Sequence, residues 1–226
     1  MKPIFLCLLL ATGSTFAVEP VSRPDPARFT GEIDAFAKQE PKRGGIVFTG
    51  SSSFRLWANM EQDFPDLPVT NRGFGGSIAN DLTTFFETVV ARHEPKLIVT
   101  YTGTNDLNAK LGVQATFGDY TNFLTVAHER FPRARIIITS VKIAPSRVQQ
   151  IPQVSELNDR LLTWSVGKSW VRYVDCTSYL ADPAGQPIAS YYREDMLHLN
   201  PSGYAKWKTI LDPVLHEEWT KANPAP

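Results

Sequence analysis

The sequence predicts an α/β fold in which helices cover both faces of a five-stranded parallel sheet. Two observations support this prediction. Five short runs are apolar and rich in β-branched or aromatic residues, as parallel strands buried on both faces are. The segments between them carry apolar residues three or four positions apart, the period of an amphipathic helix. Strands and helices that alternate in this way form βαβ units with parallel strands and right-handed crossovers.

The predicted elements follow one another along the chain, separated by turn residues. The five strands are expected at residues 46–49, 69–71, 97–101, 136–139 and 171–174. Apolar stripes mark the helices, formed by Phe29, Ile33 and Phe36; by Leu82, Phe85, Phe86, Val89 and Val90; by Tyr120, Phe123, Leu124, Ala127 and Phe131; and by Val154, Leu157 and Leu161. A last helix is predicted to begin with Asn200 as N-cap and Pro201 at the first position, where proline needs no N–H partner.

The first residues have the pattern of a secretory signal peptide. Lys2 precedes an apolar run at residues 4–10, and the small residue Ala17 follows Thr15-Phe16. We therefore expect residues 1–17 to be removed and residues 18–226 to form a single domain. Cys176 is the only cysteine of that mature chain, so no internal disulfide is expected. The predicted location is the periplasm or the outside of the cell.

Charge and hydropathy exclude some classes of partner. The 226 residues include 23 Lys and Arg and 23 Asp and Glu, so the basic excess typical of nucleic-acid-binding proteins is missing. A membrane-spanning helix needs about 18 or more apolar residues in a row, and the sequence has no such run. We therefore expect neither nucleic-acid binding nor stable membrane insertion. The composition leaves the oligomeric state open.

Polar and glycine-rich blocks follow the first three predicted strands, and a fourth block lies near the C-terminus. They are residues 50–53 (GSSS), 71–77 (NRGFGGS), 103–106 (GTND) and 195–200 (DMLHLN). In parallel α/β sheets, functional groups collect at the carboxyl ends of the strands. The blocks are therefore the candidate functional site.

The residue types in these blocks fit nucleophilic catalysis. A serine becomes a nucleophile when a base takes its proton, and His198 can serve as that base. Asp195, three residues earlier, can lie on the same side of a turn and orient the imidazole. Local sequence alone leaves open which serine of the first block and which glycine of the second take part.

In order and placement, the four blocks resemble those of the SGNH hydrolases, also called the GDSL family of lipases and esterases. The resemblance covers about residues 45–205. It implies a three-layer α/β/α sandwich similar to flavodoxin, in agreement with the predicted elements. The family's first block reads Gly-Asp-Ser-Leu, so Ser51 stands here in place of the aspartate and Ser53 in place of the leucine.

The resemblance also implies a role for each site residue. It assigns the nucleophile to Ser52 and the other catalytic positions to Asp195 and His198. Three hydrogen-bond donors would form the oxyanion hole: the backbone N–H groups of Ser52 and Gly76 and the side-chain amide of Asn105. Gly73 and Gly75 compete with Gly76 on sequence alone. We expect Asp106 to be structural and to hold the loop that carries Asn105.

Neither a metal nor an organic cofactor is expected. The sequence has no His-Glu-x-x-His motif and no pair of cysteines in the mature chain, and the second block lacks the third glycine of a dinucleotide-binding loop. The partner is expected to be a small-molecule or glycan ester.

The resemblance implies an exported serine ester hydrolase that cleaves short-chain carboxylic esters through an acyl-enzyme on Ser52. The alternatives with the same site are an O-acyltransferase, a carbohydrate deacetylase, and a lysophospholipase or thioesterase. A non-catalytic protein that binds carbohydrate or lipid is the alternative of a different class. The short-chain preference depends on six large side chains, some of which are expected to join the core while the others crowd the cleft. They are Phe54, Trp57, Phe74, Tyr191, Tyr192 and Met196.

Overall fold

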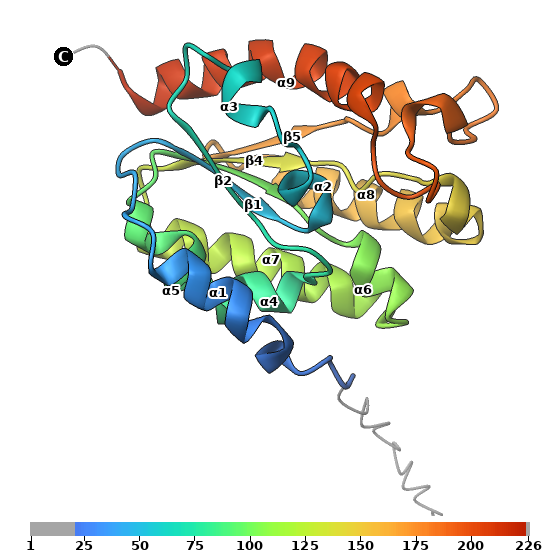
Figure 1. Cartoon of the computed structure of the whole chain (residues 1–226), viewed down its shortest axis with the longest axis horizontal. Coiled ribbons are helices and arrows are strands. Elements are labelled where there is room, and N and C mark those ends of the chain that lie inside the picture. Colours follow the sequence, from blue (N-terminus) through green and yellow to red (C-terminus); the bar gives the residue numbers. More distant parts are fainter. Residues whose placement is uncertain (1–20, 225–226) are drawn as a thin grey trace, which may run out of the picture.

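The central sheet has five parallel strands in the order β2-β1-β3-β4-β5, in a computed structural model that describes residues 21–224 (Figure 1). The predicted signal peptide, residues 1–17, lies outside the described residues. The strands are β1 (Ile46–Gly50), β2 (Val69–Gly73), β3 (Leu97–Tyr101), β4 (Arg135–Thr139) and β5 (Val171–Val174). The predicted five-stranded parallel sheet is confirmed, and every predicted strand lies within an observed one.

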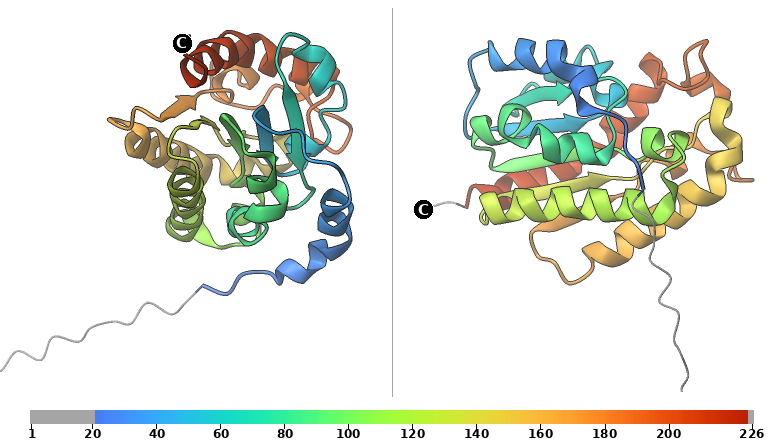
Figure 2. Two further views of the ribbon diagram at one scale, coloured as in Figure 1. Left: turned by 90° about the vertical axis from the view of Figure 1, so that its left-hand side faces the viewer. Right: turned by 90° about the horizontal axis from the view of Figure 1, so that it is seen from below.

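Helices cover both faces of the sheet, so the fold is the predicted three-layer α/β/α sandwich (Figures 1 and 2). Successive strand residues point to opposite faces: Val47 joins one core layer and Phe48 the other. One layer contains α1 (Thr30–Ala37), α4 (Ala79–Thr84), α5 (Phe86–Val89), α7 (Gly112–Arg130) and α8 (Ile151–Ser165). The other contains α2 (Ser52–Arg55), α3 (Met60–Asp63) and α9 (Pro201–Ala222).

The structure corrects the prediction at two kinds of boundary. β1 continues to Gly50 and β2 to Gly73, both of which lie beyond the predicted strand ends, because these two glycines still pair across the sheet. The stripe from Leu82 to Val90 is not one helix but two, α4 and α5. Phe85 leaves the helical conformation between them and packs edge-on against Phe74, with ring centres 6.2 Å apart.

The beginning of α9 agrees with the prediction. The Asn200 side chain accepts hydrogen bonds from the backbone N–H groups of Ser202 and Gly203, and Pro201 is the first helical residue. This cap fixes the chain immediately after the fourth sequence block. No helix among residues 21–224 combines the length and the apolar character that a membrane crossing requires.

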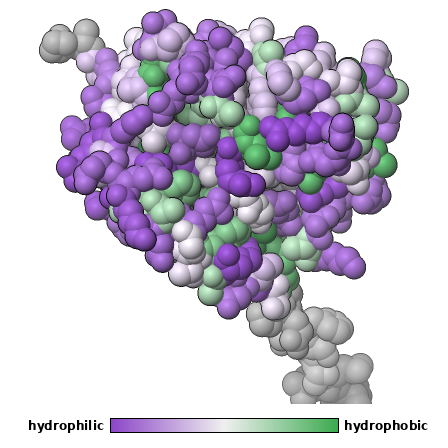
Figure 3. All heavy atoms as spheres, viewed as in Figure 1, coloured by the Kyte–Doolittle hydropathy of each residue, from purple (hydrophilic) through white to green (hydrophobic). Residues whose placement is uncertain are grey.

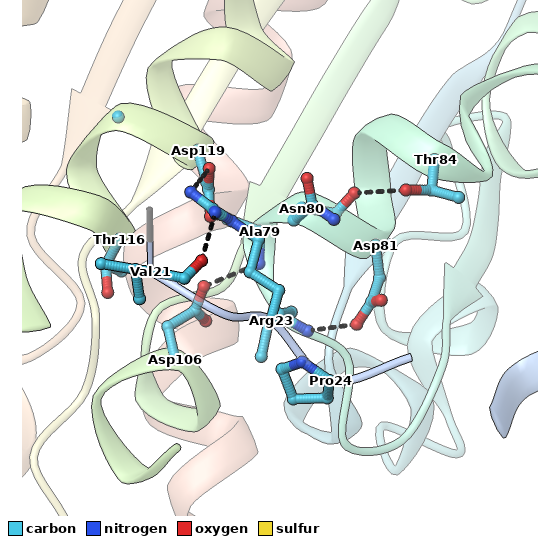
Figure 4. Close-up of polar contacts among 12 residues, drawn as sticks. Val21, Arg23, Pro24, Ala79, Asn80, Asp81, Thr84, Asp106, Thr116 and Asp119 are labelled. Carbon is cyan, nitrogen blue, oxygen red and sulfur yellow. Dashed lines mark hydrogen bonds and ion pairs between the residues drawn. The ribbon is translucent and has the colours of Figure 1, made fainter. Parts of the chain in front are cut away.

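The described chain begins with a segment that runs past α4 and α7 (Figure 4). The Arg23 guanidinium donates two hydrogen bonds to Asp119 on α7, at 2.6 and 2.7 Å. Farther along, Arg28 donates to the buried Asp81 on α4, and the same carboxylate accepts the backbone N–H of Ile78 at 2.9 Å. These contacts hold the segment against α7 and against α4, the helix that follows the second sequence block.

Candidate active site

Four loops at the carboxyl end of the sheet form the candidate site. Three of them follow β1, β2 and β3, and the fourth precedes α9. The first loop is a tight turn at Gly50, whose φ of +148° suits glycine. A Cβ atom there would stand 2.0 Å from the Tyr101 carbonyl oxygen, so β1 and β3 can approach only because this residue is glycine. The turn places Ser52 at the first position of α2.

Ser52, His198 and Asp195 form a continuous hydrogen-bonded line, although Ser52 and His198 are 146 positions apart. Ser52 Oγ lies 2.9 Å from His198 Nε2, and His198 Nδ1 lies 2.6 Å from Asp195 Oδ2. The other carboxylate oxygen accepts the backbone N–H groups of Leu197 and His198, both at 2.9 Å. The fourth block therefore forms a turn in which the Asp195 side chain accepts hydrogen bonds from the backbone of the residues that follow it.

The ionisation of Asp195 sets the proton positions along this line. Desolvation acts to raise its pKa, but hydrogen bonds from the His198 ring and from the backbone of His198 and Leu197 outweigh it and lower the pKa to about 2. An ionised carboxylate can only accept, so His198 Nδ1 carries the proton that it donates to Asp195. In the neutral imidazole, Nε2 is then an acceptor, and it receives the hydroxyl hydrogen of Ser52.

The geometry separates the three adjacent serines. Ser52 is half-buried and reaches His198, whereas Ser51 and Ser53 are only 3% and 2% exposed. The Ser53 carbonyl accepts the hydroxyl of Tyr204 at 2.9 Å, which ties α2 to α9. Among the three, Ser52 alone has its hydroxyl in the hydrogen-bonded line.

The glycines of the second block also differ in surroundings. A Cβ atom on Gly73 would stand 2.5 Å from the Arg55 backbone nitrogen, and one on Gly75 would stand 2.6 Å from Arg55 Nε. Because these two residues have no side chain, the second loop can pack closely against α2. Gly76 is exposed with open space around it, and its φ of +85° is in the region that favours glycine. No hydrogen bond found within residues 21–224 uses the Gly76 N–H.

Asn105 and Asp106 connect the third loop to the second. Asn105 Nδ2 donates to the Ser77 carbonyl at 3.0 Å, which leaves its second amide hydrogen for another acceptor. The buried Asp106 carboxylate accepts the N–H of Ala79 at 2.8 Å (Figure 4). It also accepts the N–H of Gly103 at 3.1 Å. Burial raises the pKa of Asp106 to about 7, although both N–H bonds act to lower it. These contacts agree with the expected structural role of Asp106.

Of the six large side chains that were expected to divide between the cleft and the core, four belong to the core. Phe54, Trp57, Phe74 and Tyr192 are all at least 95% buried in the two core layers. The helix that follows β1 turns one face to the sheet, so the rings next to Ser52 pack inward rather than into the cleft. Trp57, for example, stacks on Tyr204 with ring centres 5.1 Å apart.

Lys142 is a site-supporting residue that the sequence analysis missed. It is 2% exposed, its Nζ donates to the Leu197 carbonyl at 2.6 Å, and it lies 5.6 Å from the centre of the Tyr192 ring. The Tyr192 hydroxyl in turn donates to the Ile143 carbonyl at 2.6 Å. Two bonds therefore hold the turn that carries Asp195 and His198 against the chain after β4. A lysine inside an apolar run just past a strand end was the available signal.

Replacing Lys142 with methionine should remove a pH-dependent part of the stability. Burial, with a smaller effect from the charge of Arg147, lowers the pKa of Lys142 to about 7 from its ordinary 10.5. Between these values the unfolded chain binds more protons than the folded one, so this lysine makes stability rise with pH. The wild type should gain stability relative to Lys142→Met as pH rises through this window.

The measurement is urea unfolding of both proteins from about pH 6 to about pH 10. Lys38→Met, at an exposed position after α1, controls for the loss of one positive charge. A stability difference between wild type and Lys142→Met that stays constant across this pH range would contradict the prediction.

Comparison with known proteins identifies a family that matches most of the chain. The model of the GDSL-like lipase/acylhydrolase family matches residues 44–206, a span that contains all four sequence blocks. No curated protein matches the sequence. Among the described residues, no group of three or more His, Cys, Asp or Glu side chains is placed to hold a metal ion.

Several solved structures share the fold. A candidate acylhydrolase from Bacteroides fragilis is 22% identical, with a TM-score of 0.72 over 86% of this chain and 99% of its own. A GDSL-like lipase from Bacteroides thetaiotaomicron is 21% identical, with a TM-score of 0.70 over 85% and 98%. A carbohydrate esterase of family 3 from Talaromyces cellulolyticus is 18% identical, with a TM-score of 0.62 over 77% and 97%.

Proposed function

Because this chain belongs to the GDSL-like lipase/acylhydrolase family, and is therefore a hydrolase that acts on esters, we propose that it works through an acyl-enzyme on Ser52. The observation that carries the proposal is the line from Ser52 Oγ through the His198 ring to Asp195, with separations of 2.9 and 2.6 Å. The hydroxyl, the imidazole and the carboxylate have the order that nucleophilic acyl transfer requires.

The proposed reaction has two halves. Ser52 Oγ attacks the ester carbonyl carbon as its proton passes to His198 Nε2. The bond to the alcohol oxygen then breaks, and Nε2 gives that oxygen the proton. In the second half a water molecule attacks the acyl-serine, its proton passes to Nε2, and the proton returns to Ser52 Oγ as the carboxylic acid leaves. Asp195 keeps Nδ1 protonated and stabilises the imidazolium in both halves.

The negative charge that forms on the carbonyl oxygen needs hydrogen-bond donors. We assign this role to the N–H groups of Ser52 and Gly76 and to the Asn105 amide. Ser52 is the first residue of α2, so its N–H has no partner within that helix. The open surroundings of Gly76 and the second amide hydrogen of Asn105 support the assignment. Losing one such donor costs about 10²- to 10³-fold in kcat in comparable enzymes.

The proposed substrates are small-molecule or glycan esters with short acyl groups. The space beneath the nucleophile is filled by the core: the Phe54 ring lies 5.2 Å from that of Phe48 and 6.1 Å from that of Trp207. Two cavities of about 680 and 700 Å³ lie elsewhere, one along α7 and α8 and the other lined in part by Pro95 and Lys221. The face seen in Figure 3 is mostly hydrophilic, with hydrophobic residues in small separate patches.

We propose further that the protein is exported to the periplasm or beyond, on the evidence of the signal-peptide pattern in residues 1–17. An exported enzyme would meet esters of extracellular or cell-envelope compounds.

Acyl length gives a direct test of the proposed substrate class. Each methylene removed from water contributes about 0.8 kcal/mol, but only if the protein covers it. With the core closed beneath Ser52, we expect kcat/KM to be highest for acetyl to butyryl esters of 4-nitrophenol. A value of kcat/KM that rises steadily from the butyryl to the palmitoyl ester would contradict the prediction and indicate a true lipase.

The same assay separates hydrolysis from acyl transfer. If a sugar hydroxyl replaces water in the second half, added glycans will collect the acyl group and the yield of free acid will fall. We expect free acid to remain the main product in the presence of glycans. Acyl-glycan as the main product would assign the chain to the O-acyltransferases.

A further inference from the structure

The chain after β4 brings an arginine to the wall of the site. Ser146 donates from both its backbone N–H and its hydroxyl to the Met196 carbonyl, each at 2.9 Å. The next residue, Arg147, donates from Nη1 to the Thr104 carbonyl at 2.9 Å. Met196 lies between Asp195 and His198, and Thr104 directly precedes Asn105. Arg147 therefore lies where the third loop meets the turn that carries the histidine.

The Arg147 guanidinium is half-buried and has no carboxylate partner within 4 Å among residues 21–224. Two other half-buried arginines are paired with a carboxylate, Arg23 with Asp119 and Arg135 with Glu218. The buried Arg72 and the half-buried Arg92 also lack a carboxylate, but each donates to two neutral acceptors. Arg72 donates to the side chains of His93 and Gln39, and Arg92 to the carbonyls of Phe36 and Ala37.

For Arg147, the Thr104 carbonyl is the only acceptor found within the described part of the chain. A guanidinium has five N–H donors, so most of the donors of Arg147 remain available. Burial lowers the pKa of Arg147, as expected for a charge that has lost water without gaining a counter-charge. A partly desolvated charge is costly unless something pairs with it.

Two other basic side chains contact the turn that carries His198, Lys142 at the Leu197 carbonyl and Arg193 at the Leu199 carbonyl. Lys142 is close enough for its pKa to be lowered in part by the charge of Arg147. Within residues 21–224, the acceptors found for the Arg193 guanidinium are the Leu199 and Leu56 carbonyls. The neighbouring carboxylate, Asp195, is already held by His198 and two backbone N–H groups. Because Lys142, with a pKa of about 7, is only partly charged at neutral pH and Asp195 is already engaged, neither of these neighbours neutralises Arg147.

We propose that Arg147 binds an anionic group of the substrate, a carboxylate or a phosphate, that lies close to the ester being cleaved. The inference rests on the proposed function and narrows its substrate class to acyl esters of acidic compounds. A planar guanidinium can present two parallel N–H donors to either anion, which gives orientation as well as affinity. Arg147 is then a specificity residue, separate from the groups that move the proton.

The test compares matched esters that differ only in the acid group. One pair is acetylated methyl glucoside and acetylated glucuronic acid methyl glycoside; the other is acetylglycerol and acetylglycerol phosphate. The wild type should have the higher kcat/KM for the acidic member of at least one pair. Arg147→Gln should lower the acidic-to-neutral ratio of kcat/KM about tenfold or more, mainly through KM. The pair that responds identifies the anion.

Two further variants sharpen the result. Arg147→Lys should keep part of the preference for a phosphate, which a point charge can bind, and less of the preference for a carboxylate. Arg172→Gln removes an exposed arginine on β5, far along the sheet from β1, and should leave the ratio unchanged. A wild type that prefers neither acidic member, or an Arg147→Gln variant that loses both members of each pair equally, would overturn the proposal.

Binding provides a readout that does not depend on catalysis. Titration calorimetry should detect methyl glucuronide or glycerol phosphate binding to the wild type and about tenfold weaker binding to Arg147→Gln. If both proteins bind neither anion, the inference fails while ester hydrolysis can stand. If the wild type binds an anion but cleaves no ester, the proposed function fails and the anion site stands.

Discussion

Replacing Ser52 with alanine is expected to abolish ester hydrolysis and leave the fold intact. The Ser52 hydroxyl contacts His198 Nε2 and fills no space in the core, so its loss removes the nucleophile at little structural cost. In a comparable serine hydrolase, removing the nucleophile lowers kcat by about 2 × 10⁶-fold. The measurement is kcat/KM for an acetyl ester, with thermal unfolding as the check on folding.

The neighbouring serines supply the matched controls. Ser51→Ala and Ser53→Ala should keep measurable turnover, because neither hydroxyl belongs to the hydrogen-bonded line with His198. Both side chains are buried, so a modest change in unfolding temperature is compatible with the account. If Ser51→Ala is the inactive variant and Ser52→Ala retains activity, the assignment of the nucleophile is wrong by one residue.

The second large effect is expected at His198 and, to a smaller degree, at Asp195. His198→Ala removes the group that moves the proton and should approach the loss seen for Ser52→Ala. Asp195→Asn keeps an oxygen for the N–H groups of Leu197 and His198 but offers the imidazole an amide instead of a carboxylate. The amide favours the wrong tautomer, and in a related triad this change costs about 10⁴-fold in kcat.

The comparison of kcat among wild type, His198→Ala and Asp195→Asn tests this division of labour. Because the pKa of Asp195 is about 2, its carboxylate stays ionised throughout the neutral range and should add no step to the pH profile of activity there. Its contribution to stability is lost only in acid, as pH falls through the folded-state pKa. Equal and complete loss in both variants, with both still folded, would contradict the expected order.

The sheet could be predicted because parallel strands buried on both faces are apolar along their whole length. The break at Phe85 could not, because the apolar stripe continues through α4 and α5: periodicity reports which face is buried, not whether the helix is continuous. Trp57 and Phe74 were expected in part in the cleft because they adjoin site residues in sequence. Neighbouring residues in a turn direct their side chains to opposite sides, and the rings of Trp57 and Phe74 both pack in the core.

How much of the site could be predicted depended on how far apart in sequence the interacting residues lie. The four blocks were recognisable because each is a local pattern at a strand end, and the structure brings Ser52, Asp195 and His198 together. Lys142 and Arg147 were missed because their contacts lie 55 and 43 residues away, at Leu197 and Thr104. No local pattern encodes such pairings, and they emerge only when the loops after β3 and β4 meet the turn before α9.

The central claim is that the acyl group passes through Ser52, and trapping the intermediate tests it most directly. The enzyme is mixed with a short-chain activated ester, quenched in acid within the first turnover, digested and examined by mass spectrometry. We expect one acyl group on the peptide that contains residues 51–53, located by fragmentation on Ser52 and absent from Ser52→Ala. An acyl group on another residue, or undiminished hydrolysis by Ser52→Ala, would contradict it.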